Sequence, residues 1–467
     1  MSENSMNSRT ASDKPVNEPH ENKMGVEPIR GLLIRMALPL MLSMLVQALY
    51  NIVDSIYVSR INEAALTAVS MAFPIQTIMV AVISGTGVGV NAMLSRSLGE
   101  KNYANADKAA NNGAFLAICS YIFFVILGVF VTRPFYMSQI SYDMEIVNYG
   151  VTYMSIVCIF SFGFCAQMTF ERMMQGTGLT FYTMITQMTG AVINIILDPM
   201  FIFGIGFFPK IGVAGAAVAT CIGQTVAGIM AITMNARFNK EIHVSLSHVF
   251  RPSAKVIKEI YRVGIPSIIM ASIGSVMYYG MNLILTGFSS TASAVFGVYY
   301  KLQSFFFMPV FGMNNAIVPL MAYNYGARKK KRMIDTLKNA LVMAIVIMCI
   351  GTLAFETIPQ VLLGFFNASD NMLEIGMPAL RIIGVHFPVA AVCIVLGTTF
   401  QALGQATYSA IVSLGRQLIV LLPVAWLLAH FLGLGAVWCS FPIAEVMSLI
   451  LTLIFFRRVY TGTIAKI

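Results

Sequence analysis

The stretch Ala37–Ser59, ALPLMLSMLVQALYNIVDSIYVS, decides the fold of this chain. It is apolar at most positions, and its one charged side chain is that of Asp54. A helix of about 20 such residues crosses the hydrocarbon layer of a bilayer, which is roughly 30 Å thick. Because the lipid offers no partners to backbone N–H and C=O groups, an apolar segment of this length spans as an α-helix. The stretch therefore predicts a transmembrane helix.

Runs of the same kind recur along nearly the whole chain. Of its 467 residues, 57% are hydrophobic and only 11% are charged. A water-soluble globule could not bury that much apolar surface. The composition therefore predicts an all-α membrane protein with about twelve transmembrane helices. The expected spans lie near residues 32–57, 66–92, 110–131, 148–169, 181–203 and 212–234, and then near 262–286, 292–317, 337–357, 376–399, 407–430 and 434–456.

Lysine and arginine residues gather in alternate connections between these spans. Cytoplasmic loops of membrane proteins carry an excess of both residue types. With both termini in the cytoplasm, only Arg60, Arg133 and Lys210 fall in outer loops. The pattern predicts a multi-pass protein of the bacterial inner membrane. It also accounts for most of the net charge of +10, so the charge does not indicate a nucleic-acid partner.

The composition also divides the chain into lobes and tails. Residues 1–30 are rich in Ser, Asn, Glu and Pro, which predicts a disordered cytoplasmic tail. Two six-helix lobes are expected at 31–235 and 262–458, joined by a cytoplasmic linker at 236–261 and followed by a short cytoplasmic tail at 459–467.

An internal repeat relates the two lobes. A constant offset of 227 residues aligns Pro39 with Pro266, and the same offset aligns Gly85 with Gly312 and Gly99 with Gly326. Because each half has an even number of spans, both halves enter the membrane from the same side. The repeat is therefore parallel, and a cleft between the halves would suit alternating access.

The chain resembles the MATE (multidrug and toxic compound extrusion) transporters, in their bacterial MepA-like and DinF-like branch. The resemblance covers roughly residues 30–458. Its marks are the first-span stretch quoted above, AFP at 72–74, NIILDPMFIFG at 194–204, GVAGAAVAT at 212–220, FFFMPVFGMNNAIVPLMAYNYGA at 305–327 and FQALGQA at 400–406. This resemblance implies two six-helix lobes in a V-shaped arrangement and export of amphipathic, often cationic compounds in exchange for protons or sodium ions.

Two aspartates inside the spans are the leading candidates for cation coupling, because a carboxylate in hydrocarbon is costly and usually functional. Asp54 ends a polar stripe on one helical face, formed with Gln47, Tyr50 and Asn51. Asp198 ends a comparable stripe in the fifth span, formed with Thr183, Gln187 and Asn194. Both helices run outward and both acids sit late in their spans. The two acids should therefore share a depth and line one cavity.

The chemistry of these side chains fits a small cation. Carboxylates with a neighbouring amide can hold Na⁺ through oxygen ligands or take up a proton. The resemblance adds that the acids matching Asp54 and Asp198, and the amide matching Asn194, are implicated in coupling. Pro199 would let the fifth helix bend beside this site. The competing interpretation is that tyrosine or asparagine hydrogen bonds satisfy these acids, which then do not titrate.

The second lobe carries its own charged residues near mid-membrane, namely Lys301, His386, Arg416 and Glu445. One interpretation makes Glu445 the counter-ion of Lys301 or Arg416. The other makes Glu445 a contact for cationic substrate. With Lys301, Gln47, Tyr50, Asn51 and Gln187, Glu445 completes the predicted substrate cleft.

Other motifs indicate no cofactor and no resident metal. The cysteines show no CxxC spacing and the histidines no HExxH motif. Gly85, Gly87 and Gly89 lie inside an apolar span, where helix packing explains them better than nucleotide binding. The absence of a P-loop argues against an ATP-driven pump.

The sequence thus predicts a cation-coupled multidrug efflux antiporter that is not an enzyme and works as a monomer. A flippase for a lipid-linked saccharide is the nearest alternative, because related two-lobed transporters share the architecture. A membrane-embedded transferase is the third, although no His, Asp or Ser constellation supports it. Proton and sodium coupling remain equally open.

Overall fold

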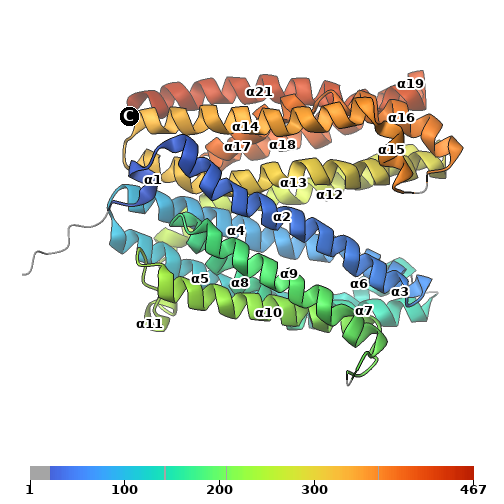
Figure 1. Ribbon diagram of the computed structural model, residues 1–467, viewed down its shortest axis with the longest axis horizontal. Helices are drawn as coiled ribbons and strands as arrows, with labels where there is room; N and C mark the ends of the chain where they lie inside the picture. The colour runs from blue at the N-terminus through green and yellow to red at the C-terminus, as the bar shows by residue number, and fades with distance from the viewer. Residues whose placement is uncertain (1–20, 141–142, 207, 367) are drawn as a thin grey trace, which may run out of the picture.

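The computed structural model describes residues 21–140, 143–206, 208–366 and 368–467, and within these ranges the regular structure is helical throughout. Figure 1 shows two layers of long, nearly parallel helices, the first half of the chain below and the second half above. The first half contains α1 (Lys23–Val26), α2 (Ile29–Ser59), α3 (Glu63–Met71), α4 (Phe73–Gly99), α5 (Tyr103–Ile126), the π-helix η1 (Leu127–Val131), α6 (Thr132–Ile140), α7 (Met144–Ile159), α8 (Phe162–Gly176), α9 (Thr180–Phe203) and α10 (Val213–Phe238).

The second half repeats this plan after a short connecting helix. It contains α11 (Leu246–Val249), α12 (Ala254–Thr286), α13 (Ser290–Gly326), α14 (Lys330–Thr357), α15 (Pro359–Gly364), α16 (Asp370–Gly384), α17 (Phe387–Ala402), α18 (Ala406–Leu414), the π-helix η2 (Gly415–Leu421), α19 (Leu422–Leu432), α20 (Leu434–Val437), α21 (Ser440–Gly462) and the short 3₁₀ helix η3 (Ile464–Lys466).

The helices account for every expected span. In the described part of the chain, ten helical segments are long and apolar enough to cross a membrane, and two bent pairs bring the number to as many as twelve. The bent pairs are α7 with α8, at 47°, and α16 with α17, at 48°. Each pair is the fourth span of its half. The predicted two-lobed, all-α membrane fold is confirmed, with the same bend in both repeats.

Local sequence signals set several helix boundaries. The side chains of Asn62, Asn102 and Ser289 each accept a hydrogen bond from a backbone N–H in the first turn of α3, α5 and α13. Asp143 caps α7 in the same way. At the other end of a helix, Gly204 adopts the left-handed conformation (φ 73°) that stops α9. The helix α9 is continuous and contains Pro199 in its last turn.

The two lobes are joined at one end of the molecule only. Figure 1 places α1 and the C-terminus at the same end, called the terminal end below. One buried apolar cluster unites the second-half helices with the terminal halves of α2, α4 and α5, through residues such as Leu33, Leu94 and Ala109. A separate cluster, which includes Ile75 and Val213, belongs to the first half alone and fills its opposite end. The lobes therefore share a core at the terminal end and have separate cores towards the opposite end.

Glycines that correspond in the repeat bring the lobes together at the shared core. A Cβ on Gly99 of α4 would lie 2.0 Å from the carbonyl oxygen of Tyr323 in α13, and a Cβ on Gly326 would lie 2.2 Å from that of Arg96 in α4. The repeat relates these two contacts to one another. Gly85 against α12 and Gly312 against α2 form a second such pair, so backbone meets backbone at symmetry-related positions.

The predicted tail at residues 1–30 is wrong in its last part. Residues 1–20 lie outside the described residues. From residue 22 onward the chain forms the cap of α1, then α1 itself, and α2 begins at Ile29. Met24 is fully buried. The composition of the segment is polar, but docking onto both lobes supplies the buried surface that the composition alone does not indicate.

Candidate functional site

A polar cluster in the first lobe joins α2, α9 and α10. The carboxyl groups of Asp54 in α2 and Asp198 in α9 lie next to each other and interact electrostatically. Asn194, one turn before Asp198, donates from Nδ2 to Asp198 Oδ1 at 3.3 Å and to Thr220 Oγ1 in α10 at 3.1 Å. The predicted coupling residues Asp54, Asn194 and Asp198 thus lie together, and Thr220 joins them.

Glycines set the spacing of the helices that carry this cluster. A Cβ on Gly223 of α10 would lie 2.7 Å from the carbonyl oxygen of Gly190 in α9 and 3.4 Å from the Cβ of Asn194. The two helices can approach closely because neither carries a side chain at this crossing. As a result, the short side chains of Asn194 and Thr220 reach each other across the interface.

The cluster has more acceptor oxygens than donors. Asp198 is completely buried and Asn194 is 3% exposed. Asp54 Oδ1, Asn194 Oδ1 and Asp198 Oδ2 are buried and have no hydrogen-bond partner among the described residues. Two carboxyl groups can share a hydrogen bond only when one of them holds a proton. The cluster therefore lacks positive charge, which a proton or a metal cation would supply.

Two tyrosine side chains lie near Asp54 and Asp198. Tyr50 and Tyr153 both interact electrostatically with Asp54 and Asp198. The hydroxyl of Tyr153 accepts a hydrogen bond from Gln76 Nε2 at 3.2 Å.

The stripe on α2 divides into a buried and an open part. Tyr50 and Asp54 are half-buried, whereas Gln47 and Asn51 are exposed. All four lie on one side of α2, as predicted from their spacing.

The stripe on α9 splits between two polar clusters. Asn194 and Asp198 belong to the cluster described above, but Gln187 donates to Glu171 Oε2 of α8 at 2.7 Å. Glu171 is 1% exposed and also accepts from Gln167 and Thr186. The sequence analysis did not single out Glu171, because it ended the fourth span before this residue. The available signal in the sequence was that two polar residues, Gln167 and Glu171, lie one helical turn apart.

Arg172, the residue after Glu171 in α8, is buried between the lobes. Its guanidinium donates to Asn315 Oδ1 of α13 at 2.6 Å and to Ser84 Oγ of α4 at 3.1 Å. Gly87 makes room for it, since a Cβ there would lie 2.6 Å from Arg172 Cγ. Gly85 and Gly89 meet α12 in the same manner. The interpretation of this glycine string as a packing feature is confirmed.

The charged residues of the second lobe form a separate group. Glu445 in α21 is 2% exposed and pairs with Arg416 of η2 at 3.0 Å. His386 and Tyr299 interact electrostatically with this pair. Lys301 is exposed, and its Nζ lies 6.0 Å from the centre of the Phe366 ring. The counter-ion of Glu445 is therefore Arg416, not Lys301, and Glu445 lies inside the lobe.

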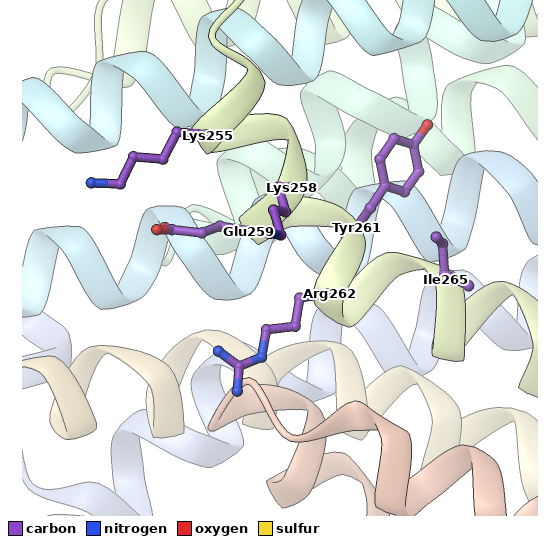
Figure 2. A pocket seen from close by; sticks show the side chains of 6 residues that line it. All are labelled: Lys255, Lys258, Glu259, Tyr261, Arg262 and Ile265. Atoms are coloured by element: carbon purple, nitrogen blue, oxygen red, sulfur yellow. The ribbon is translucent and has the colours of Figure 1, made fainter.

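The surface hollow in Figure 2 is unrelated to these clusters. It is an open depression at the start of α12, lined by Lys255, Lys258, Glu259, Tyr261, Arg262 and Ile265, and their side chains point in different directions. It lies at the terminal end, whereas Asp54 and Asp198 lie towards the opposite end of their helices. Among the described residues, no group of three His, Cys, Asp or Glu side chains could hold a metal ion.

Comparison with known protein families identifies the family to which this chain belongs. The sequence profile of the MatE family matches residues 39–200 and again residues 266–427. The chain belongs to the MatE family. The two matches begin at Pro39 and Pro266, which are a corresponding pair of the predicted repeat. The family assignment and the two-fold repeat are both confirmed.

Similar proteins agree with this assignment. The multidrug export protein MepA of Staphylococcus haemolyticus is 27% identical over 430 residues, which cover 89% of this chain and 90% of that protein. A crystal structure of a MATE protein in the straight conformation is 26% identical, with a TM-score of 0.83 over 96% of this chain and 99% of that chain. An outward-facing MATE family transporter, 24% identical, has the same fold, with a TM-score of 0.89 over 96% of this chain and 99% of that chain.

Proposed function

We propose that this chain is a secondary active multidrug efflux transporter of the bacterial cell membrane, which exports amphipathic, often cationic compounds by antiport with H⁺ or Na⁺. The observation that carries the proposal is the buried cluster of Asp54, Asn194 and Asp198, with its unpaired oxygens. Ionisable groups inside membrane helices are costly, and they mark ion and proton pathways. The related MepA protein, named for multidrug export, supports the same function.

The cluster suits either coupling ion. Carboxylate and amide oxygens, with the hydroxyl of Thr220, are ligands of the hard type that small cations prefer. A proton bound by either Asp54 or Asp198 would equally let the two neighbouring carboxyl groups form a hydrogen bond with each other. Sodium would be bound transiently, as the transported ion, and no cofactor is required.

Access to the cluster follows from the way the lobes meet. The positive-inside rule puts the terminal end, and with it both termini, in the cytoplasm. The lobes share a core at that end, so the acids, which lie towards the opposite end, would be reached from outside. The entering cation and the departing drug would compete for binding to the same conformational state of the lobes. This competition is sufficient to couple their movements.

The predicted substrate contacts fall into two groups. The exposed side chains of Gln47 and Asn51, with half-buried Tyr50, are well placed on α2 to meet a substrate between the lobes. Gln187 is engaged with Glu171, and Glu445 with Arg416. A substrate contact at Gln187 or Glu445 would require these bonds to open, so their structural roles are better supported. Lys301 is exposed and remains a candidate contact.

The driving force is adequate for efflux. One cation that enters down a membrane potential of about 100 mV releases roughly 2.3 kcal/mol, and each unit of pH gradient adds about 1.4 kcal/mol. Together these support a ratio of about 500-fold across the membrane for an uncharged substrate.

The flippase alternative has less support. A cleft for the pyrophosphate of a lipid-linked saccharide needs several unpaired cations, but Arg416 is neutralised by Glu445. The transferase alternative lacks a catalytic constellation, and the relatives are named export proteins and transporters. Because one chain supplies both lobes, we also infer that the monomer is the working unit.

Transport by purified protein in proteoliposomes tests this proposal. We expect efflux of a fluorescent lipophilic cation when an inward proton gradient or an inward sodium gradient is imposed, with one gradient effective and the other not. The effective gradient identifies the coupling ion. If folded protein moves no such compound under either gradient, but does move a lipid-linked saccharide, the efflux proposal is wrong and the flippase takes its place.

A further inference from the structure

The segment from Glu21 to Pro28 lies across the junction of the two lobes at the terminal end. In Figure 1 it forms the turn through α1 that leads into α2, beside the ends of α13 and α14. This segment, called the strap below, is tied to both lobes by hydrogen bonds from side chains outside the membrane-spanning helices or at their ends.

Asn22 attaches the start of the strap to the first lobe. Its Nδ2 donates to the carbonyl oxygen of Thr177, after α8, at 3.2 Å and to Glu241 Oε1, after α10, at 3.0 Å. The same side chain accepts from the N–H of Met24 at 2.9 Å and so caps α1. Gly178 gives the strap space, because a Cβ there would lie 2.9 Å from Lys23 Cε.

Three residues of the second lobe hold the strap from the other side. Asn324 Nδ2 and Arg332 Nη2 both donate to the carbonyl oxygen of Met24, at 3.1 and 3.0 Å. Arg332 Nη2 also donates to the carbonyl oxygen of Glu27 at 2.8 Å. Lys329 Nζ donates to that of Gly25 at 3.0 Å.

An ion pair and a buried side chain complete the attachment. Lys329 pairs with Glu21, and this hydrogen bond lowers the pKa of the Glu21 carboxyl below its ordinary value, so the pair stays ionised at neutral pH. Met24 is fully buried in the core that the lobes share. The strap is thus packed as well as hydrogen-bonded.

The linker between the lobes makes a corresponding attachment on the other repeat. Before α12, the N–H groups of Ser245 and Ser253 donate to the side chains of Asn111 and Asn112 in α5, at 2.9 and 2.8 Å. In each repeat, therefore, the segment that precedes the first long helix docks on the opposite repeat, the linker on α5 and the strap on the junction of α13 and α14. Among the described residues, the start of the strap is held by the side-chain contacts of Glu21 and Asn22.

We propose that the strap is a conformational latch, which favours the state in which the lobes are closed at the terminal end and must release one lobe before that end can open. Opening would break either the two bonds of Asn22 or the group of bonds from Asn324, Lys329 and Arg332. The latch would control how readily the terminal end opens during the transport cycle. Its effect on the transport rate rests on the proposed function, but the latch itself does not.

The distance between the lobes at the terminal end tests the latch. Spin labels on Lys108 of α5 and Arg458 of α21, both exposed, would report that distance in full-length protein in lipid nanodiscs with the native cysteines replaced. We expect one dominant short distance in the parent protein. Replacing Asn22 with alanine, or Lys329 with alanine, should raise the population with a longer distance about fivefold, as the loss of one net hydrogen bond implies.

The matched control is Lys255→Ala, which makes the same lysine-to-alanine change as Lys329→Ala at an exposed position at the start of α12, away from the strap. It should leave the distance distribution unchanged. Equal distributions for the parent protein, Asn22→Ala and Lys329→Ala would overturn the latch. Because this readout needs no transported compound, its result is distinguishable from a failure of the efflux proposal.

Discussion

Replacing Asp198 with asparagine is expected to reduce gradient-driven efflux by about 100-fold, the scale set by loss of a buried charged partner. The side chain is completely buried beside Asp54 and Asn194, and asparagine keeps its size while removing the charge that attracts a cation. The initial rate of efflux from proteoliposomes, normalised to the amount of reconstituted protein, measures the effect. Asp54→Asn should behave in the same way.

Glu259→Gln serves as the matched control for this experiment. It makes the same carboxyl-to-amide change at an exposed position on α12, far from the cluster. It should transport at the parent rate. Efflux that persists at the parent rate in Asp198→Asn would mean that the two acids are merely satisfied structural groups.

Replacing Gly99 with leucine is expected to prevent the terminal end from closing. Even a Cβ at this position would lie 2.0 Å from the carbonyl oxygen of Tyr323, so the backbones of α4 and α13 would have to separate. The ratio of closed to open lobes should fall by about 5- to 150-fold, since an overpacked contact costs roughly 1–3 kcal/mol. The spin-label distance between Lys108 and Arg458 measures this ratio, and Gly326→Leu should repeat the effect.

Gly31→Ala is the control for the glycine contact. Gly31 lies inside α2 with no atom within 4 Å of its added Cβ. Alanine there should leave the distance unchanged and stabilise the helix by about 0.5–1 kcal/mol. If Gly99→Leu and the parent protein show the same population with the short, closed-lobe distance, the glycine pair is not needed to close the terminal end.

The spans were predictable because lipid imposes a length and an apolar composition on each of them. The repeat was predictable for a related reason, since Pro39 and Pro266, or Gly99 and Gly326, serve the same packing role in each half. The strap was not predictable. Its polar composition is typical of disorder, and its order comes from burial of Met24 and from hydrogen bonds to both lobes, which the composition does not reveal.

The site was partly predictable. The depth of Asp54 and Asp198 in their spans indicated that they could meet, as they do. Thr220 gave no signal, because a hydroxyl in an apolar helix usually bonds its own backbone. The hydrogen-bond partner of Gln187 was not predictable, since helical spacing fixes a face but not the neighbouring helix that supplies the partner. Glu171 is that partner.

The most direct test of the central claim is the release of the coupling ion when a substrate binds. A lipophilic cation is added to purified, weakly buffered protein, and released protons are followed with a pH indicator or released sodium with a radioactive tracer. Our account predicts release from the parent protein and none from Asp54→Asn or Asp198→Asn. Undiminished release from both variants, with substrate still bound, would contradict the assignment of this cluster as the coupling site.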